Sequence, residues 1–153
     1  MKQRIYIDTS VVGGYFDDEF NDATIALFKR FEQGELIFVV SNLLDLELIA
    51  APLRVRELLY RYPQENFERV ELTEDAIFLA DKYISEKVVG KTSLEDCRHI
   101  ALATINRVDV LASWNFKHIV NLDRIKGYNS VNLRLGYPMI EIRSPKDLLH
   151  YED

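Results

Sequence analysis

The sequence predicts an α/β protein, a three-layer α/β/α sandwich with a mostly parallel central sheet. Short apolar runs alternate along the chain with segments whose apolar residues recur at helical spacing. Residues 35–41, ELIFVVS, form a continuous apolar run of the kind that a parallel sheet buries on both faces. Residues 109–113, DVLAS, form a second short buried strand of this type. With 153 residues and no linker or repeat, the chain is expected to form one domain over residues 1–153.

The first half of the chain is expected to alternate strand and helix. The strands are expected at residues 4–7, 35–41 and 67–72, with the last at an edge of the sheet. The helices are expected over residues 20–33, 42–51 and 53–61, and they end at Gly34, Pro52 and Pro63.

The second half continues this alternation. Thr73 is expected to cap a helix that reaches about Val88, and residues 90–93 form a turn into a helix from 94 to about 106. A strand follows at 109–113, and residues 118–134 mix weak helix with loop. The chain closes with a strand and a short helix, for which Ser144 is the cap, Pro145 the first residue and Asp147 an acid of the first turn.

Composition narrows the class of protein. The formal net charge is −6, which does not suggest a basic nucleic-acid binder but suits an acidic site that binds cations. The single cysteine, Cys97, cannot form an intrachain disulfide, which favours a reducing compartment. Asp8 interrupts the apolar run near the N-terminus, and no stretch reaches the roughly 20 apolar residues of a membrane span. We therefore expect a cytoplasmic protein without a membrane segment.

Asp8 raises the first functional question, because it ends the buried strand in IYIDTSVV, residues 5–12. A charge beside a core strand is costly unless it is paired, caps a helix or binds a metal. Capping is one explanation, since residues 9–11 can begin a helix. In open α/β sheets, however, ligands bind outside the carboxyl ends of the strands, where Ser41, Ser113 and Asn115 also fall.

Glu47 and Asp96 join Asp8 as candidates. In a helix over 42–51, Glu47 lies at the middle of the most apolar face, so it needs a partner, either a salt-bridging arginine or a metal. Asp96 follows Ser93 by three residues, so a capping interaction explains it, yet it shares a helix face with His99, Ile100 and Ala103. His99, on the same face, is interpreted as a hydrogen-bonded core histidine.

The remaining motifs exclude several kinds of site. Three widely separated histidines and one cysteine provide no zinc spacing, and no dinucleotide-binding, Walker or nucleophilic-triad pattern is present. Asp8, Glu47 and Asp96 remain, with the polar Ser113 and Asn115. Oxygen ligands select Mg²⁺ or Mn²⁺, and such a cluster suits metal-assisted hydrolysis of a phosphodiester.

Four segments give the chain a resemblance to a known family. They are YIDTSV at 6–11, VVSNLLDLELIAAP at 39–52, SLEDCRHIALAT at 93–104 and VLASWNFKHIVN at 110–121. Together and in this order they resemble PIN-domain proteins, in particular toxin nucleases of the VapC type. The C-terminal IEIRSPKDLL, residues 140–149, is similar to the closing strand and turn of these proteins.

The resemblance implies a PIN-like fold and an acidic pocket that binds Mg²⁺ or Mn²⁺ and cuts RNA. Asp8, Glu47 and Asp96 match the family's first three acids, and so they are the expected metal ligands and catalytic residues, with Ser10 and Ser113 in support. Asn115 is assigned to the catalytic site as well, but it stands where many members have a fourth acid. His118 stands where another acid is often found. The site thereby loses negative charge, and a second metal is expected to bind weakly or not at all.

The leading hypothesis from the sequence is a metal-dependent endoribonuclease that leaves a 5′-phosphate and a 3′-hydroxyl. Lys91, Arg98 and Lys117 are candidate phosphate contacts, or else ordinary solvated surface. The resemblance also implies a cognate antitoxin that places a basic residue in the pocket, and a homodimer. The aromatic residues that could form a dimer interface, or equally belong to the core, are Phe20, Phe28, Phe31, Tyr60 and Tyr62.

Two alternatives stay open at this stage. A PIN fold with weak or no catalysis could act as a binding module in a partner complex, and the missing fourth acid and acidic net charge favour it. An acidic α/β phosphotransfer domain of the receiver type requires an acceptor aspartate on a middle strand, which DVLASWN, residues 109–115, does not offer.

Overall fold

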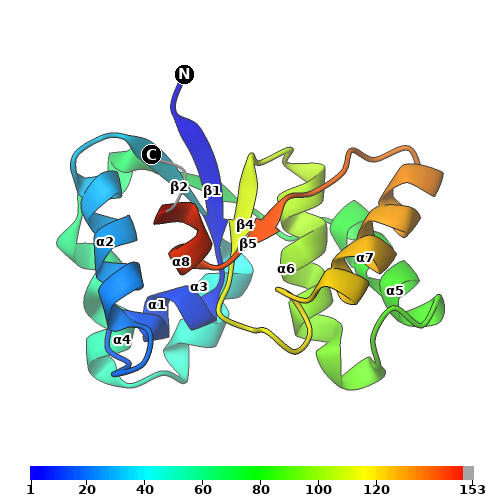
Figure 1. Ribbon diagram of the computed structural model, residues 1–153, viewed down its shortest axis with the longest axis horizontal. Helices are drawn as coiled ribbons and strands as arrows, with labels where there is room; N and C mark the ends of the chain where they lie inside the picture. The colour runs from blue at the N-terminus through cyan, green and yellow to red at the C-terminus, as the bar shows by residue number, and fades with distance from the viewer. Residues whose placement is uncertain (150–153) are drawn as a thin grey trace.

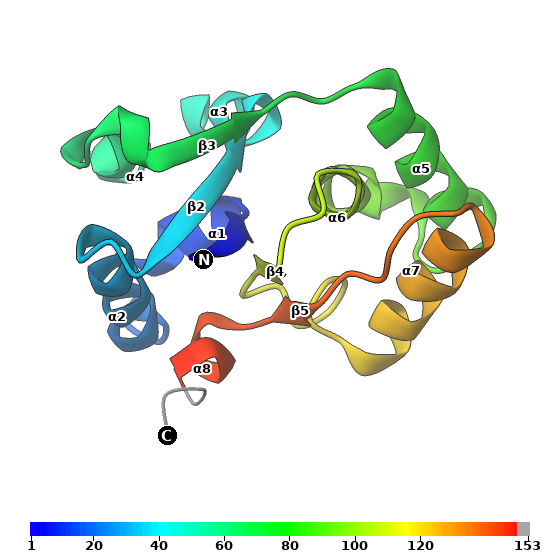
Figure 2. The same cartoon turned by 90° about the horizontal axis from the view of Figure 1, so that it is seen from above.

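In the computed structural model, which describes residues 1–149, a parallel sheet lies between two layers of helices (Figures 1 and 2). The sheet has five strands in the order β3-β2-β1-β4-β5, and each neighbouring pair is parallel. The strands are β1 (Gln3–Ile7), β2 (Leu36–Ser41), β3 (Phe67–Val70), β4 (Val110–Ala112) and β5 (Ile142–Arg143). The predicted α/β sandwich is confirmed, and the sheet is parallel throughout the described residues.

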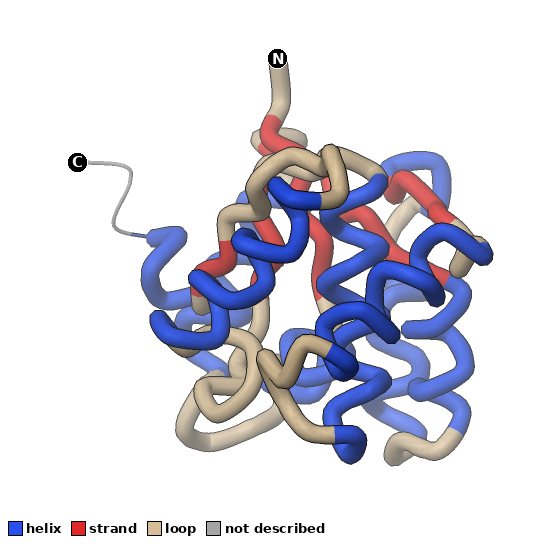
Figure 3. The backbone as a smooth tube through the Cα atoms, turned by 90° about the vertical axis from the view of Figure 1, so that its right-hand side faces the viewer, coloured by secondary structure: helices blue, strands red, loops and turns tan. Residues whose placement is uncertain are grey.

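The helices divide into two groups, one on each face of the sheet (Figure 2). The first group comprises α1 (Thr9–Gly14), α2 (Asn21–Glu32), α3 (Asn42–Ile49), α4 (Leu53–Glu57) and α8 (Pro145–Leu148). The second comprises α5 (Glu74–Ser85), α6 (Leu94–Ile105) and α7 (Leu122–Arg134). Short 3₁₀ helices lie at Leu58–Arg61, Gln64–Asn66 and Lys91–Ser93. Figure 3 shows the strands enclosed between these helices.

The two cores follow from the period-two alternation of the strands. Ile5 and Ile7 pack in the core beneath α2, whereas Tyr6 between them packs in the core beneath α5 and α6. Phe38 and Val39 divide in the same way between the two cores. Successive side chains of a strand point to opposite faces, so a sheet covered on both faces needs an unbroken apolar run. This explains why residues 35–41 read as continuously apolar.

Two elements differ from the sequence expectation. Residues 118–134, expected as weak helix and loop, contain the continuous helix α7. Its inward face carries the polar Asn129 and Asn132, which obscure the apolar periodicity. Asn129 donates to the carbonyl of Ile140 at 3.1 Å and accepts from its N–H at 2.8 Å, so the helix needs these amides. The helix expected over 53–61 instead ends at Glu57 and continues as a 3₁₀ turn.

The helix caps agree with the sequence except at one position. Thr73 caps α5, and Ser144 with Asp147 forms a capping box at α8. Ser93, expected to cap the helix of Asp96, makes no side-chain capping hydrogen bond. The hydroxyl–acid spacing predicts a cap only from local sequence, and here the chain enters α6 through a 3₁₀ turn, with Ser93 at φ −97° and ψ 17°. Within residues 1–149, no helix is long and apolar enough to cross a bilayer.

Candidate active site

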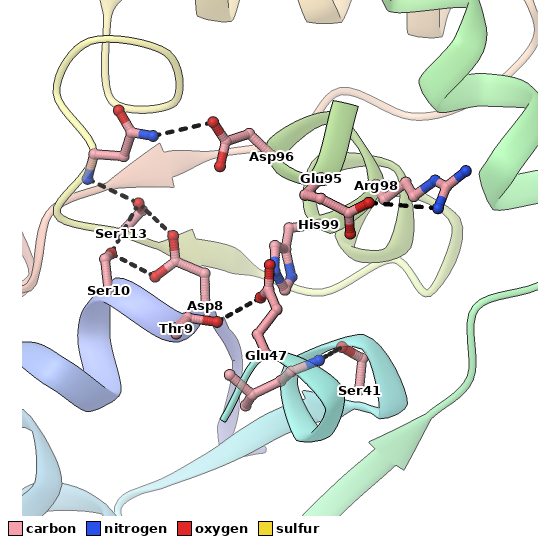
Figure 4. Close-up of polar contacts among 12 residues, drawn as sticks. Asp8, Thr9, Ser10, Ser41, Glu47, Glu95, Asp96, Arg98, His99 and Ser113 are labelled. Carbon is pink, nitrogen blue, oxygen red and sulfur yellow. Dashed lines mark hydrogen bonds and ion pairs between the residues drawn. The ribbon is translucent and has the colours of Figure 1, made fainter. Parts of the chain in front are cut away.

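Asp8 lies at the carboxyl end of β1, where its carboxylate caps α1 and accepts hydrogen bonds from two serine hydroxyls (Figure 4). Its carboxylate is 4 % exposed, and one oxygen accepts from the N–H of Val11 at 3.1 Å, which caps α1. The same oxygen accepts from the Ser10 hydroxyl at 2.6 Å, and the other accepts from the Ser113 hydroxyl at 2.6 Å. Asp8 therefore caps α1, and its carboxylate is also oriented by two serine hydroxyls, one from the same turn and one 105 residues away.

The Glu47 carboxylate is held by a series of hydrogen bonds through residues of α6, β1 and β2. Its Oε1 lies 2.6 Å from Nε2 of His99, and the hydroxyl of Thr9 donates to the same oxygen. The other ring nitrogen, Nδ1 of His99, lies 2.7 Å from the Tyr6 hydroxyl. That hydroxyl lies 2.8 Å from the Ser41 hydroxyl, which in turn caps α3, the helix that carries Glu47. The partner of Glu47 is therefore a histidine, and not the arginine that charge pairing suggested.

Asp96 stands in the first turn of α6, across the site from Asp8 (Figure 4). Its Oδ2 accepts from the side-chain amide of Asn115 at 3.2 Å. The Oδ1 of Asn115 accepts from the N–H groups of Lys117 and His118, at 3.1 and 3.0 Å. The Asn115 side chain is thus held by backbone N–H groups of the loop after β4. It donates a hydrogen bond to Asp96, whereas an acid at position 115 would place a negative charge there.

The segment after β4 connects these groups. The N–H of Trp114 donates to the Ser10 hydroxyl at 2.8 Å, and the N–H of Asn115 donates to the Ser113 hydroxyl at 3.0 Å. Ser10 and Ser113 therefore each accept a backbone hydrogen bond while they donate to Asp8. A hydroxyl whose acceptor side is occupied in this way has its proton directed toward the carboxylate.

The three acids lie close enough to affect one another. Burial raises the pKa of Asp96, and the negative charges of Asp8 and Glu47 raise it further. Burial also raises the pKa of Asp8, against the opposing effects of His99 and the two serine hydroxyls. Burial opposes ionisation of Glu47, but hydrogen bonds from His99 and Thr9 outweigh it and leave the pKa of Glu47 below its ordinary value. The charges of Asp8 and Asp96 are therefore incompletely compensated, whereas that of Glu47 is compensated by His99 and Thr9.

These residues fit a hard divalent cation by their chemistry. The donors are carboxylate, hydroxyl and amide oxygens, and the mutual repulsion of the acids is what a bound cation relieves. Among residues 1–149, however, no three His, Cys, Asp or Glu side chains are arranged as a group that could hold one ion. One reason is visible at Glu47, whose carboxylate is engaged by His99 and Thr9.

The structure binds Asp8 to Ser10 and Ser113, and Asp96 to Asn115, but within residues 1–149 the three acids do not form a group that could hold one ion. Tyr6 and Thr9 also contact these residues but were not assigned to the site, because a tyrosine in an apolar strand and a threonine after a strand carry no specific signal. The sequence placed Ser41 at a strand end, and there it caps α3 and contacts the Tyr6 hydroxyl. The core interpretation of His99 is confirmed, since it is buried and hydrogen bonded through both nitrogens. Arg98 is partly buried and pairs with Glu95 on its own helix at 3.5 Å, and no contact between Arg98 and the acids of the site is observed within residues 1–149.

Comparison with solved structures gives the same fold. The chain aligns with DNA-bound VapBC from Salmonella typhimurium at a TM-score of 0.58 and 15 % identity, over 95 % of this chain and 99 % of that one. It aligns with FitAcB from Neisseria gonorrhoeae at 0.58 and 13 %, over 93 % and 98 %. It aligns with VapC20 from Mycobacterium tuberculosis, a sarcin–ricin loop cleaving toxin, at 0.56 and 13 %, over 74 % and 91 %.

Fold and comparison together define the class: an α/β protein with the PIN-like fold of VapC-type toxin structures. Neither protein-family models nor curated protein sequences gave a match. The fold that the resemblance implied is confirmed by structures whose identity to this chain is low.

Proposed function

We propose that this protein is a metal-dependent endoribonuclease, the toxin of a toxin–antitoxin pair. The observation that carries the proposal is that Asp8 and Asp96 are both bound by the segment after β4, through Ser113 and Asn115, at the carboxyl ends of parallel strands. The charges of Asp8 and Glu47 raise the pKa of Asp96, which marks the site as one that favours a cation. A neighbour in fold, VapC20, is described as a toxin that cleaves the sarcin–ricin loop, and this supports an RNA substrate.

In this proposal Asp8, Glu47 and Asp96 would move together around Mg²⁺ or Mn²⁺, because within residues 1–149 they are not already grouped to hold one ion. When bound, the ion would activate a water molecule and offset the negative charge that develops on the phosphate. Ser10 and Ser113 hold the Asp8 carboxylate by two directed hydrogen bonds, and Asn115 orients Asp96. Hydrolysis of the phosphodiester consumes one water and leaves a 5′-phosphate and a 3′-hydroxyl.

A protein partner belongs to the same proposal, because several structural neighbours are toxin–antitoxin complexes. Helices α3 and α4 and the 3₁₀ turn Leu58–Arg61 carry a group of exposed apolar side chains that suits a protein interface, here called the α3–α4 patch. Its members Leu46, Ile49, Leu53 and Tyr60 are 64, 66, 58 and 74 % exposed. We propose that a cognate antitoxin and a homodimer are the partners of this chain.

Binding without catalysis is the second candidate. Two observations favour it: Asn115 provides an amide at the position of a fourth acid, and the Glu47 carboxylate is occupied by His99 and Thr9. Under this alternative the folded protein binds its partner and leaves RNA intact.

The test is cleavage of a mixed RNA pool in Mn²⁺, Mg²⁺ or EDTA, with calorimetric titration of the metal alone. Asp8→Asn and Asp96→Asn are compared with Asp75→Asn, an exposed acid in the first turn of α5. We expect cleavage that depends on the metal and falls at least 100-fold in the two site variants only. A folded protein that binds Mn²⁺ but leaves the pool intact would instead favour the binding module.

A further inference from the structure

Residues 113–116 form a boundary between two sites. The side chains of Ser113 and Asn115 bind the carboxylates of Asp8 and Asp96. The alternate residues, Trp114 and Phe116, line a separate groove. The segment therefore contacts the acids with two of its side chains and lines the groove with the other two.

The groove is an aromatic one of about 620 Å³. The rings of Phe20 and Trp114 stack at its floor, with centroids 4.3 Å apart and planes 19° apart. The Phe116 ring stands at an angle to both, at 6.3 Å from Phe20 and 6.0 Å from Trp114. Phe116 is 49 % exposed and Trp114 only 8 %, so Phe116 is a projecting wall above a packed floor.

The floor of the groove is held rigidly. The indole N–H of Trp114 donates to the Thr24 hydroxyl at 2.9 Å, and that hydroxyl donates to the carbonyl of Phe20 at 2.8 Å. Gly14 lies against the indole so closely that a Cβ there would be 2.7 Å from Nε1. Both stacked rings are therefore fixed before any ligand arrives, which lowers the entropic cost of binding.

We propose that this groove binds an unpaired nucleobase of the RNA substrate, next to the cleavage site. The exposed ring of Phe116 offers a stacking surface to any base, because every base has an aromatic face. The charges around the groove also favour a base over a phosphate. Its lining includes one cation, Lys146, and two carboxylates, those of Glu19 and Asp22, and two carboxylates repel a phosphate but not a neutral flat group.

The groove is connected to the acidic site, so a base bound there would position the RNA for cleavage. Trp114 donates its backbone N–H to Ser10, which binds Asp8, so the floor of the groove is joined to the acidic site by two hydrogen bonds. A base seated on Phe116 would hold the adjoining strand near the carboxylates. This inference rests on the proposed ribonuclease function and adds a base subsite that requires single-stranded RNA at that position.

Tryptophan fluorescence tests the subsite directly, because Trp114 is the sole tryptophan of the chain. Six-nucleotide single-stranded RNAs are titrated in EDTA, with each nucleotide in turn made abasic. Binding is expected to quench the fluorescence of the wild type, and one abasic position should weaken binding between about 5-fold and about 150-fold. Phe116→Ala should weaken binding of the intact RNA by a similar factor, and Phe116→Tyr should restore it.

The control is Phe78→Ala, which removes a comparably exposed ring, 54 % exposed, from α5 on the other side of the sheet. In the Phe116→Ala protein, the critical abasic substitution should have no further effect, since the two changes remove one contact. RNA bound and cleaved equally well by Phe116→Ala would overturn the subsite and leave the nuclease standing, as expected if the groove receives a side chain of a protein partner. RNA neither bound nor cleaved by the wild type would overturn both.

Discussion

The Nε2 atom of His99 lies 2.6 Å from Oε1 of Glu47, and the Tyr6 hydroxyl lies 2.7 Å from the opposite nitrogen of the same ring. The imidazole is 2 % exposed and stands edge-on to the Tyr6 ring, with centroids 5.7 Å apart. A carboxylate held in this way has one orientation, set by residues on β1 and α6. The position of Glu47 in the acidic site therefore depends on core residues that do not belong to it.

Tyr6→Phe tests this dependence. The change keeps the ring but removes the hydroxyl between His99 and Ser41, and we expect the free energy of unfolding to fall by about 1–3 kcal/mol. We also expect weaker Mn²⁺ binding, because the His99 ring and hence Glu47 lose their orientation. Tyr83→Phe is the matched control, since Tyr83 is also buried and donates to Asn132 at 2.5 Å. If both variants bind Mn²⁺ as the wild type does, Tyr6 is purely structural.

Asp96→Asn is expected to stabilise the metal-free protein, because the variant has no partly buried charge at this position. Burial and the charges of Asp8 and Glu47 raise the pKa of Asp96 in the folded state. A carboxyl with a raised folded pKa contributes stability that is present below its unfolded pKa, near 3.8, and lost as the pH rises through the folded value.

The difference in melting temperature between Asp96→Asn and wild type should therefore grow as the pH rises from about 4 to 7 in EDTA. Mn²⁺ should reverse its sign, because the wild type binds the ion more tightly. A difference that does not depend on pH would show that the Asp96 charge is not strained in the folded protein.

Asn115→Asp restores an acid at the position where the family often has one. The Asp96 carboxylate would lose its 3.2 Å amide donor and face a new negative charge, so we expect the metal-free protein to lose about 1–3 kcal/mol of stability. We expect Mn²⁺ to bind more tightly, or in a second equivalent, when titrated by calorimetry. Unchanged affinity and stoichiometry would mean that residue 115 does not face the ion.

The α3–α4 patch is the expected interface of the homodimer. Of the aromatic residues that the sequence offered for this role, Phe28 and Phe31 are core and Phe20 and Tyr62 are partly buried, whereas Tyr60 is 74 % exposed. Tyr60→Asp combined with Leu46→Asp should give a monomer by light scattering at concentrations where the wild type is a dimer. Phe78→Asp, on α5, is the control. Dimers that persist in the double variant would exclude this patch.

Local sequence was sufficient for most of the fold. The run at 35–41 predicted a strand buried on both faces, and Thr73 and Ser144 predicted helix starts, because each signal lies within a few residues of its effect. The prediction from local sequence failed at α7, whose buried face carries the polar Asn129 and Asn132. These amides hydrogen bond to each other, and Asn129 also bonds to the backbone of Ile140. Such amides can be recognised only when their distant partners are known.

By itself, the sequence determined the parallel α/β architecture and the polar residues that follow its strands, since alternation, capping and strand ends are local properties of the chain. Only the tertiary structure decided what each polar residue contacts. It paired Glu47 with His99, 52 residues away, and joined Asp8 to Ser113 across 105 residues. It also placed Trp114 and Phe116 in the lining of one groove. Hydrogen bonds and ring stacking act over a few ångströms in space, and distance along the chain does not reveal them.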